Sequence, residues 1–363
     1  MQFDNGPTGL RPPTATVELF KDPAGGDAIP YADAERAIFT TAFDRRVMAF
    51  DARSGQLRWQ RTLPQGPRGL NLPPGNVLAA GNLILLPGWD LYALDRATGQ
   101  VSWRFAPEGE YPAAAPIAME GERVFSPGST GLYAVDVRTG TQLWRTELGE
   151  RPFAPVVDKG VIYLGTRGFV GNTNVLGAGH AVAVDASDGR ILWKVPVPDP
   201  PNSPASGGVN RAGALTPELF IVAARNGRVY GIDRATGQVR WEHRAFESYV
   251  PTAPYESGVG IIDGIAVVAN LAGMIEGLDA KNGTLRWRTS TGGSSVSEQI
   301  TTDGMCAYIS VGAVRCVDAT GKIRWDHGGA SNGGPSYLTP ARVTGNRLYV
   351  GSTTGFHALV LPR

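Results

Sequence analysis

One short segment recurs seven times along this chain and constrains its fold more than any other feature. Its first copy, at residues 49–59, reads Ala-Phe-Asp-Ala-Arg-Ser-Gly-Gln-Leu-Arg-Trp, and every later copy keeps the Asp, the Gly and the Trp. Seven of the eight tryptophans stand in its last position, 38 to 49 residues apart, and the seventh copy is one residue shorter. The recurring residues are Asp51, Gly55, Trp59, Asp95, Gly99, Trp103, Asp136, Gly140, Trp144, Asp185, Gly189, Trp193, Asp233, Gly237, Trp241, Asp279, Gly283, Trp287, Asp318, Gly321 and Trp325.

This period is the length of one β-propeller blade, which consists of about four short antiparallel strands. The third repeat shows four such strands, at 115–119, 123–126, 132–135 and 142–146. The segment then spans the turn between the third and outer strands, where Asp bonds nearby backbone and Gly accepts a positive φ. Trp supplies a large apolar plate whose N–H needs a partner when buried. We therefore expect each Trp to pack against the neighbouring blade and join blade to blade.

Seven copies leave an eighth blade, which we expect to form from both ends of the chain. After the last copy, the sequence offers three further strands, at 337–343, 347–351 and 356–361. The missing outer strand is available at 14–20, near the start. Closing the ring with that strand removes an open sheet edge, which would otherwise promote aggregation.

Composition agrees with one large all-β domain. The 363 residues include 48 Gly and 27 Pro, which favour many short elements and tight turns, and 42% hydrophobic residues, enough for a sizeable core. We predict a single eight-bladed β-propeller over residues 14–363, with the last blade closed by the N-terminal strand, and a flexible tail or linker at 1–13. The formal net charge is +1 with no basic run, so nothing indicates a nucleic-acid partner. No apolar stretch approaches the roughly 18 residues that a membrane span needs.

The first 13 residues have neither the charged start nor the apolar centre of a signal peptide. Two alternatives follow from the residues: a cytoplasmic protein, or a chain whose targeting segment has been removed.

The repeated pattern resembles the tryptophan-docking motif of the pyrroloquinoline-quinone (PQQ) dehydrogenases. It is more similar still to the PQQ-like repeats of the shorter eight-bladed propellers of the BamB type. The resemblance covers essentially residues 14–363, and it is specific for the fold rather than for the function. It implies an extracytoplasmic protein of the periplasm or cell envelope, with its targeting segment absent from this chain. A lipoprotein of that type carries an N-terminal lipidated Cys, and this sequence has no Cys before Cys306.

Candidate binding residues lie in the long loops at one end of the predicted channel. The loops from outer strand to next inner strand share a face with those between second and third strands, and propeller functions sit on such loops. A quinone cofactor with several carboxylates would need convergent Arg donors and an aromatic floor. The alternative is that these loop side chains belong to an ordinary solvent-exposed surface without a ligand. The candidate cofactor-binding residues are Arg68, Trp89, Arg151, Arg167, Asn174, Arg211 and Arg225.

A catalytic quinoprotein is disfavoured, because PQQ dehydrogenases resemble one another in an adjacent Cys pair and calcium-binding carboxylates. This chain has two cysteines, Cys306 and Cys316, which are not adjacent. They flank a turn expected near Val311, so they are either a cross-strand disulfide, which implies an oxidising compartment, or two buried small residues. No catalytic residue, metal site or resident cofactor is expected, with PQQ as the alternative ligand.

We interpret the chain as a monomeric, non-catalytic scaffold that binds protein partners through one loop face. The alternative is a PQQ-binding sensor domain of a larger receptor, such as a bacterial Ser/Thr kinase. A PQQ-dependent dehydrogenase ranks third.

Overall fold

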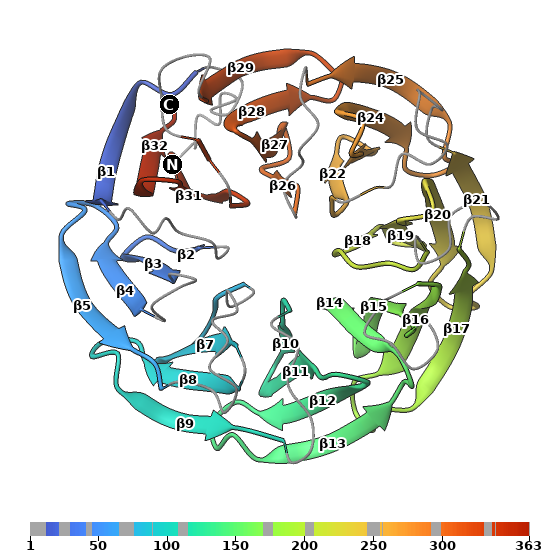
Figure 1. Cartoon of the computed structure of the whole chain (residues 1–363), viewed down its shortest axis with the longest axis horizontal. Coiled ribbons are helices and arrows are strands. Elements are labelled where there is room, and N and C mark those ends of the chain that lie inside the picture. The colour runs from blue at the N-terminus through green and yellow to red at the C-terminus, as the bar shows by residue number, and fades with distance from the viewer. Residues whose placement is uncertain are drawn as a thin grey trace, which may run out of the picture.

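Eight four-stranded antiparallel sheets form a closed ring around a common centre, so the chain is an eight-bladed β-propeller (Figure 1). The computed structural model describes residues 12–21, 30–40, 46–64, 76–88, 90–107, 115–169, 177–199, 207–244, 255, 257–291, 299–329, 336–337 and 339–362. Every helix or strand assigned among these residues is a strand. The predicted fold class is confirmed.

Blades one to seven each use four consecutive strands, ordered from the centre of the ring outward (Figure 1). Blades one to four are β2 (Tyr31–Ala32), β3 (Arg36–Thr40), β4 (Arg46–Asp51), β5 (Leu57–Thr62); β6 (Leu78–Ala80), β7 (Leu83–Pro87), β8 (Leu91–Asp95), β9 (Val101–Phe105); β10 (Ala118–Glu120), β11 (Arg123–Pro127), β12 (Gly131–Asp136), β13 (Gln142–Glu147); and β14 (Arg151–Asp158), β15 (Val161–Arg167), β16 (Gly179–Asp185), β17 (Ile191–Val197).

Blades five to eight are β18 (Ala214–Leu215), β19 (Leu219–Ala223), β20 (Arg228–Asp233), β21 (Val239–Arg244); β22 (Gly260–Ile262), β23 (Ile265–Ala269), β24 (Met274–Asp279), β25 (Leu285–Ser290); β26 (Thr301–Thr302), β27 (Cys306–Val311), β28 (Ala313–Asp318), β29 (Ile323–Gly328); and β30 (Arg342–Thr344), β31 (Arg347–Ser352), β32 (Gly355–Val360) with β1 (Ala15–Lys21) outermost. The expected inner strand of blade three is shorter than predicted and begins at Ala118.

The repeated turn is built as its residue types require. In the third copy, a carboxylate oxygen of Asp136 accepts the backbone N–H of Arg138 at 2.9 Å and of Thr139 at 2.8 Å. The N–H of Gly140 donates to the Asp136 carbonyl at 2.9 Å, and Gly140 has φ +72°. The Asp therefore satisfies backbone donors that the tight turn leaves without strand partners, and Gly supplies a conformation that other residues rarely adopt.

Each motif Trp lies opposite the small residue of its own blade, and all but Trp325 also lie against the Gly of the next blade's turn. Trp103 pairs in register with Ala93, and its indole N–H donates to the carbonyl of Val137 at 2.8 Å. A Cβ added at Gly140 would lie 2.7 Å from the Trp103 ring, so the missing side chain makes room for the indole. Five of the seven tryptophans make this bond to the carbonyl that follows the next motif Asp: Trp59, Trp103, Trp144, Trp193 and Trp287.

Blade eight has no motif Trp and contacts blade one in a different way. Its outer strand β1 pairs with β32, and Val17 takes the register position of the Trp, opposite Ala358. The blade-one carbonyl that an indole would bind belongs to Ala52. Two blade-eight side chains bond it instead, the Arg347 guanidinium at 2.6 Å and the Tyr349 hydroxyl at 3.2 Å. Joining the first and last strands in one sheet thus closes the ring, as Figure 1 shows.

Cys306 and Cys316 form a disulfide between β27 and β28, with Cα atoms 5.4 Å apart. The prediction of a turn centred near Val311 was wrong by about one residue. Tyr308, rather than Cys306, is the register partner of Cys316, so the bond is diagonal across the hairpin. Both sulfur atoms are buried beside Trp325.

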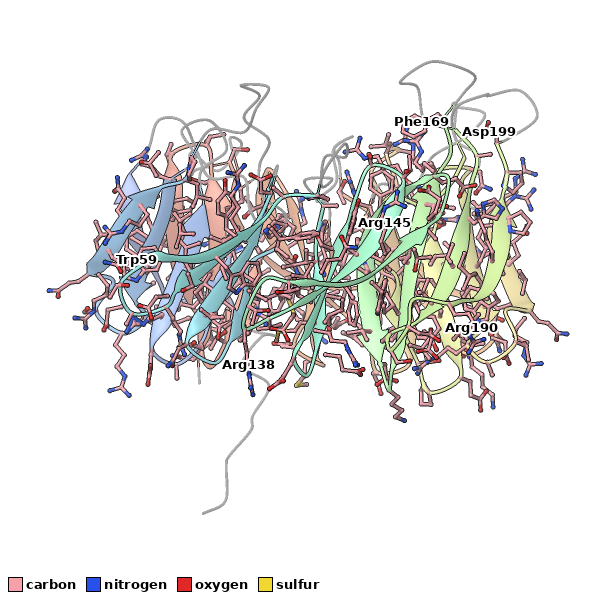
Figure 2. All side chains as sticks on the ribbon, turned by 90° about the horizontal axis from the view of Figure 1, so that it is seen from below. Trp59, Arg138, Arg145, Phe169, Arg190 and Asp199 are labelled. Atoms are coloured by element: carbon pink, nitrogen blue, oxygen red, sulfur yellow. A yellow bond between two sulfur atoms is a disulfide. The ribbon has the colours of Figure 1, made fainter. Side chains whose placement is uncertain are left out.

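The two faces of the ring differ in the connections that they carry. Figure 2 places Phe169 and Asp199, which follow the ends of β15 and β17, on one face. Arg138 and Arg190, in turns between third and outer strands, lie on the other. We call the first face the loop face and the second the turn face. The predicted sharing of one face by the two kinds of loop holds for these labelled positions.

Candidate functional site

Blade four departs from the other blades at the loop face. Its inner strand β14 has eight residues, whereas the inner strands of the other seven blades have two or three. A β-bulge interrupts its pairing between Phe153 and Val156, and the buried Ala154 has φ +38°. A non-glycine residue in this conformation is strained, and bulges and strain concentrate near functional sites. The loop-face end of blade four is therefore the first candidate for a binding site.

Two of the predicted arginines lie opposite each other at the loop-face end of blade four. Arg151 begins β14 and is the register partner of Arg167, which ends β15. The Nε of Arg167 donates to the carbonyl of Gly207 at 3.1 Å. Like charges placed directly opposite on paired strands destabilise a sheet, so this pair is not explained by stability.

Blade five brings two more arginines to the same place. Arg225 follows β19, and its backbone N–H donates to the carbonyl of Gly208 at 3.1 Å. Gly208 also lies against Arg167, because a Cβ added there would be 2.6 Å from the Arg167 Cγ. Arg211 lies three residues after Gly208 and precedes β18. Its positive charge acts on both Arg167 and Arg225. We call Arg151, Arg167, Arg211 and Arg225 the arginine cluster.

The charges of the cluster disturb one another. Burial, and then the positive charge of Arg225, lower the pKa of Arg167 to about 10, with Arg151 and Arg211 adding to the effect. Burial lowers the pKa of Arg151, and burial followed by the charge of Arg211 lowers that of Arg225. Arginine side chains carry a positive charge at neutral pH. A concentrated positive charge, partly desolvated, is what an anionic ligand needs.

The carboxylate of Asp199 opposes the charge of Arg167, and an aromatic ring lies beside Arg151. Asp199 raises the pKa of Arg167, and its carboxylate accepts the backbone N–H of Gly207 at 2.5 Å. The Arg151 guanidinium lies 5.5 Å from the centre of the Phe153 ring, and Phe169, two residues after Arg167 in the sequence, is 41% exposed on the loop face. The side chain of Asp199 therefore helps to hold the Gly207–Gly208 backbone that positions Arg167.

Several described arginines elsewhere in the chain have close carboxylate partners. Arg104 lies 2.6 Å from the carboxylate of Asp90, Arg288 lies 2.6 Å from that of Glu276, and Arg324 forms an ion pair with Asp318.

The sequence reasoning missed the residues that position the cluster. Beside Arg151, the Glu150 carboxylate contacts the Nδ1 of His180 at 2.8 Å and the Nζ of Lys194 at 3.3 Å, and it accepts the Thr166 hydroxyl. The adjacent Gly207 and Gly208 could have indicated this place from the sequence, because adjacent glycines mark a close backbone approach. The contacts of Glu150 and Asp199 had no such signal, since they join residues from different strands.

Three predicted site residues lie outside the described part of the chain: Arg68, Trp89 and Asn174. Among the residues that the structure describes, no group of three or more His, Cys, Asp or Glu side chains could hold a metal ion. No helix in that same part of the chain is long and apolar enough to cross a membrane.

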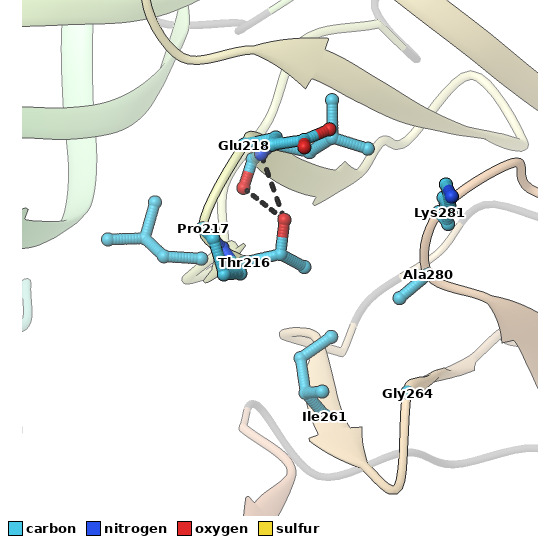
Figure 3. Close-up of a pocket in the computed structure, with 9 residues that line it drawn as sticks. Thr216, Pro217, Glu218, Ile261, Gly264, Ala280 and Lys281 are labelled. Atoms are coloured by element: carbon cyan, nitrogen blue, oxygen red, sulfur yellow. Dashed lines mark hydrogen bonds between the residues drawn. The ribbon is translucent and has the colours of Figure 1, made fainter.

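A separate cleft opens at the ends of blades five and six, away from the cluster (Figure 3). Its volume is about 450 Å³, and it lies between the β18–β19 turn around Pro217 and the blade-six residues Ile261 and Lys281. Its walls are mainly apolar, with Glu218 and Lys281 among its polar residues. The arginines of the cluster do not line it.

Comparison with known proteins agrees with the repeat. The family model PQQ_2, described as "Outer membrane protein assembly factor BamB", matches residues 11–105 and 87–249. The chain belongs to this family. The family assignment rests on more than half of the chain, and the solved structure of BamB from Moraxella catarrhalis superposes with a TM-score of 0.70 over 97% of both chains at 17% identity. That likeness shows the fold.

Curated relatives of this BamB-family chain carry different names. BamB of Burkholderia pseudomallei is 28% identical over 81% of this chain, and the tetrathionate hydrolase of Acidithiobacillus ferrooxidans is 23% identical over 74%. The serine/threonine-protein kinase AfsK of Streptomyces griseus is 24% identical over 62% of this chain. The matches span 62%, 49% and 31% of those relatives' own lengths, so their activities do not transfer with the fold.

Proposed function

We propose that this chain is a non-catalytic binding propeller of the bacterial cell envelope that binds protein partners through its loop face. The arginine cluster supports this function most strongly, because it lies where blade four, whose inner strand is extended, meets blade five. The BamB family adds support, since its described role is protein assembly at the outer membrane. The disulfide between Cys306 and Cys316 favours an oxidising compartment, as expected for a protein outside the cytoplasm.

The geometry of the arginine cluster suits a binding site better than a catalytic site. The arginines lie on two adjacent blades and are held by backbone contacts at Gly207 and Gly208, so the charged surface is largely formed before a partner arrives. Preformed surfaces lose less conformational entropy on binding. Guanidinium groups stay protonated and cannot serve as general bases at neutral pH.

Site-specific photo-crosslinking in the native host tests which face binds. A photoreactive phenylalanine analogue replaces Phe169 on the loop face in one variant and Arg190 on the turn face in another. We expect discrete protein adducts from position 169 and none from position 190. Equal adducts from both positions, or none from position 169, would contradict binding through the loop face.

A second function, sensing of PQQ, is favoured by the same cluster. PQQ carries several carboxylates, which arginines bind bidentately, and a relative of this chain is a serine/threonine kinase. A calorimetric titration with PQQ, with and without Ca²⁺, tests this directly. Micromolar binding that raises the melting temperature of the wild-type chain and is lost in Arg167→Met would establish a PQQ site. No heat and no thermal shift would leave the protein-binding function.

A PQQ-dependent dehydrogenase is the least supported reading. Cys306 and Cys316 are bonded across one hairpin of blade seven, at a distance along the chain from the arginine cluster of blades four and five. They do not form the adjacent pair that such enzymes share.

A further inference from the structure

We infer that the cleft between blades five and six binds a small organic cation, a guanidinium group on an apolar stem with no second positive charge. Ala280 and Lys281, on one wall, belong to a turn between a third and an outer strand, so the cleft opens on the turn face. The inference is therefore independent of the loop-face function proposed above. A volume of about 450 Å³ with mainly apolar walls is typical of small-molecule sites.

The chain itself fills the equivalent place between blades one and two with an arginine. Arg96 directly follows the motif residue Asp95 of blade two, and its side chain is 24% exposed. Its guanidinium forms ion pairs with Asp33 and, at 3.7 Å, with Glu35, both from the β2–β3 turn of blade one. Carboxylates of the preceding blade therefore hold a guanidinium group at this junction.

An arginine also fills this place between blades four and five. Arg234 directly follows the motif residue Asp233 and pairs with the carboxylate of Asp158, which ends β14 of blade four. Its guanidinium lies 5.1 Å from the centre of the Tyr163 ring, and its side chain is only 13% exposed. Two junctions of the ring thus seat a guanidinium group against a carboxylate of the preceding blade.

Blade six lacks this arginine, and the cleft lies where its side chain would be. Ala280 directly follows the motif Asp of blade six, and its N–H donates to the carbonyl of Gly264 at 2.9 Å. The Arg234 N–H donates in the same way to the carbonyl of Glu218 at 2.9 Å. The two backbones are therefore equivalent, and the side chains differ. Figure 3 shows Ala280 and Glu218 on opposite sides of the cleft.

The preceding blade still supplies a carboxylate at this junction. Glu218 corresponds to Glu35, because each directly precedes the second strand of its blade. Thr216 takes the place of Asp33, since each donates its N–H to the carbonyl three residues later at 2.9 Å. The Thr216 hydroxyl accepts the N–H of Leu219 at 2.9 Å within its own turn (Figure 3). Glu218 makes no ion pair and no side-chain hydrogen bond among the residues that the structure describes, so its carboxylate is available to a cation.

The walls and Lys281 define the rest of the ligand. Pro217, Leu219 and Ile261 offer apolar surface to a stem, and a guanidinium group is weakly hydrated, so it loses little on entering such a cleft. Lys281 also lines the cleft and forms no ion pair within the described part of the chain. Its ammonium would repel a second positive charge on the ligand. One guanidinium group on an apolar stem fits this combination.

Ligand-observed NMR on the full chain tests the inference with butylguanidine as the probe. We expect saturable saturation-transfer signals with a dissociation constant of about 1 mM or lower. Butylurea is the neutral isostere of the probe, and agmatine adds a terminal ammonium to the same stem. Each should bind at least about fivefold more weakly than butylguanidine.

Two substitutions locate the probe. Ala280→Arg returns the side chain that Arg96 and Arg234 supply at the other two junctions, and it should weaken binding more than about tenfold because it fills the cleft. Glu218→Gln should weaken binding about fivefold, the loss of one partly exposed charge contact. The matched control Glu122→Gln, at the corresponding position of blade three, should bind within about twofold of the wild type.

Each contrary result overturns a stated part of the inference. Equal binding of butylurea would overturn the cation, and equal binding of agmatine would overturn the exclusion of a second charge. Unchanged binding in Ala280→Arg would overturn the location, and so would an equal loss in Glu122→Gln. Absence of saturable binding to a wild-type chain with a cooperative thermal transition would overturn the site.

Competition separates a free cation from an arginine side chain of a polypeptide. If a blocked tripeptide with a central arginine binds more tightly than butylguanidine, the occupant is a polypeptide and the small-molecule assignment falls. If Ala280→Arg has no cooperative thermal transition, the comparison of butylguanidine with butylurea on the wild type decides instead. Crosslinks from position 169 test the loop face and are independent of all these outcomes.

Discussion

Replacing Gly140 by Ala measures how strongly the blades are joined. At φ +72°, an Ala side chain costs roughly 1–2 kcal/mol, partly offset by the smaller entropy of the unfolded chain. Its Cβ would also lie 2.7 Å from two atoms of the Trp103 ring, which is held in place by its bond to Val137. Overpacking of this kind costs about 1–3 kcal/mol. We therefore expect a total loss of about 2–4 kcal/mol.

The matched control for this change is Gly121→Ala. Gly121 has φ +59°, and a Cβ added there has no heavy atom within 4 Å, so only the backbone cost of roughly 1 kcal/mol remains. Gly55→Ala should lie between the two, because its Cβ would meet the flexible Leu19 side chain at 3.0 Å rather than an indole. Equilibrium urea unfolding, followed by tryptophan fluorescence and circular dichroism, gives the three losses. Equal losses at Gly140 and Gly121 would refute blade joining through the Trp–Gly contact.

Three further changes probe ring closure, pH and the disulfide. Arg347→Ala should cost about 1–3 kcal/mol in urea unfolding because the blade-one carbonyl loses a charged donor, while Arg138→Ala should change stability by less than about 0.5 kcal/mol. Burial lowers the pKa of His357 below 6.5, so the folded chain binds fewer protons than the unfolded chain. The free energy of unfolding should thus fall as pH drops below 6.5, and a pH series on His357→Gln should show a smaller fall. Reduction of Cys306–Cys316 should lower the free energy of unfolding by about 2–3 kcal/mol, and an unchanged unfolding midpoint would contradict this.

Much of the fold was predictable because its chemistry is local. The Asp, Gly and Trp of each repeat lie within about eleven residues, and their roles in one turn follow from backbone bonding and steric access. The eighth blade was predictable by counting strands, since Val17 and Ala358 belong to segments that pair only when the ring closes. The blade-one contact of Arg347 was not predictable, because it joins residues 295 positions apart with no repeated pattern.

The candidate site was predictable only in part. Loop position alone placed Arg151, Arg167, Arg211 and Arg225 on one face, and the structure brings these four together. What loop position could not give was the extended inner strand of blade four, because its bulge around Ala154 lies outside the repeated segment. The contacts made by Glu150 depend in the same way on side chains from three different strands.

The stability of Arg151→Met tests most directly whether the arginine cluster exists for binding. Met keeps the apolar stem beside Phe153 and removes a partly buried charge whose pKa burial lowers. If the cluster serves a ligand, this variant should unfold at higher urea concentration, with a gain of about 1 kcal/mol, the size of one partly exposed charge interaction. A variant that loses stability would show that Arg151 is structural and contradict the proposed site.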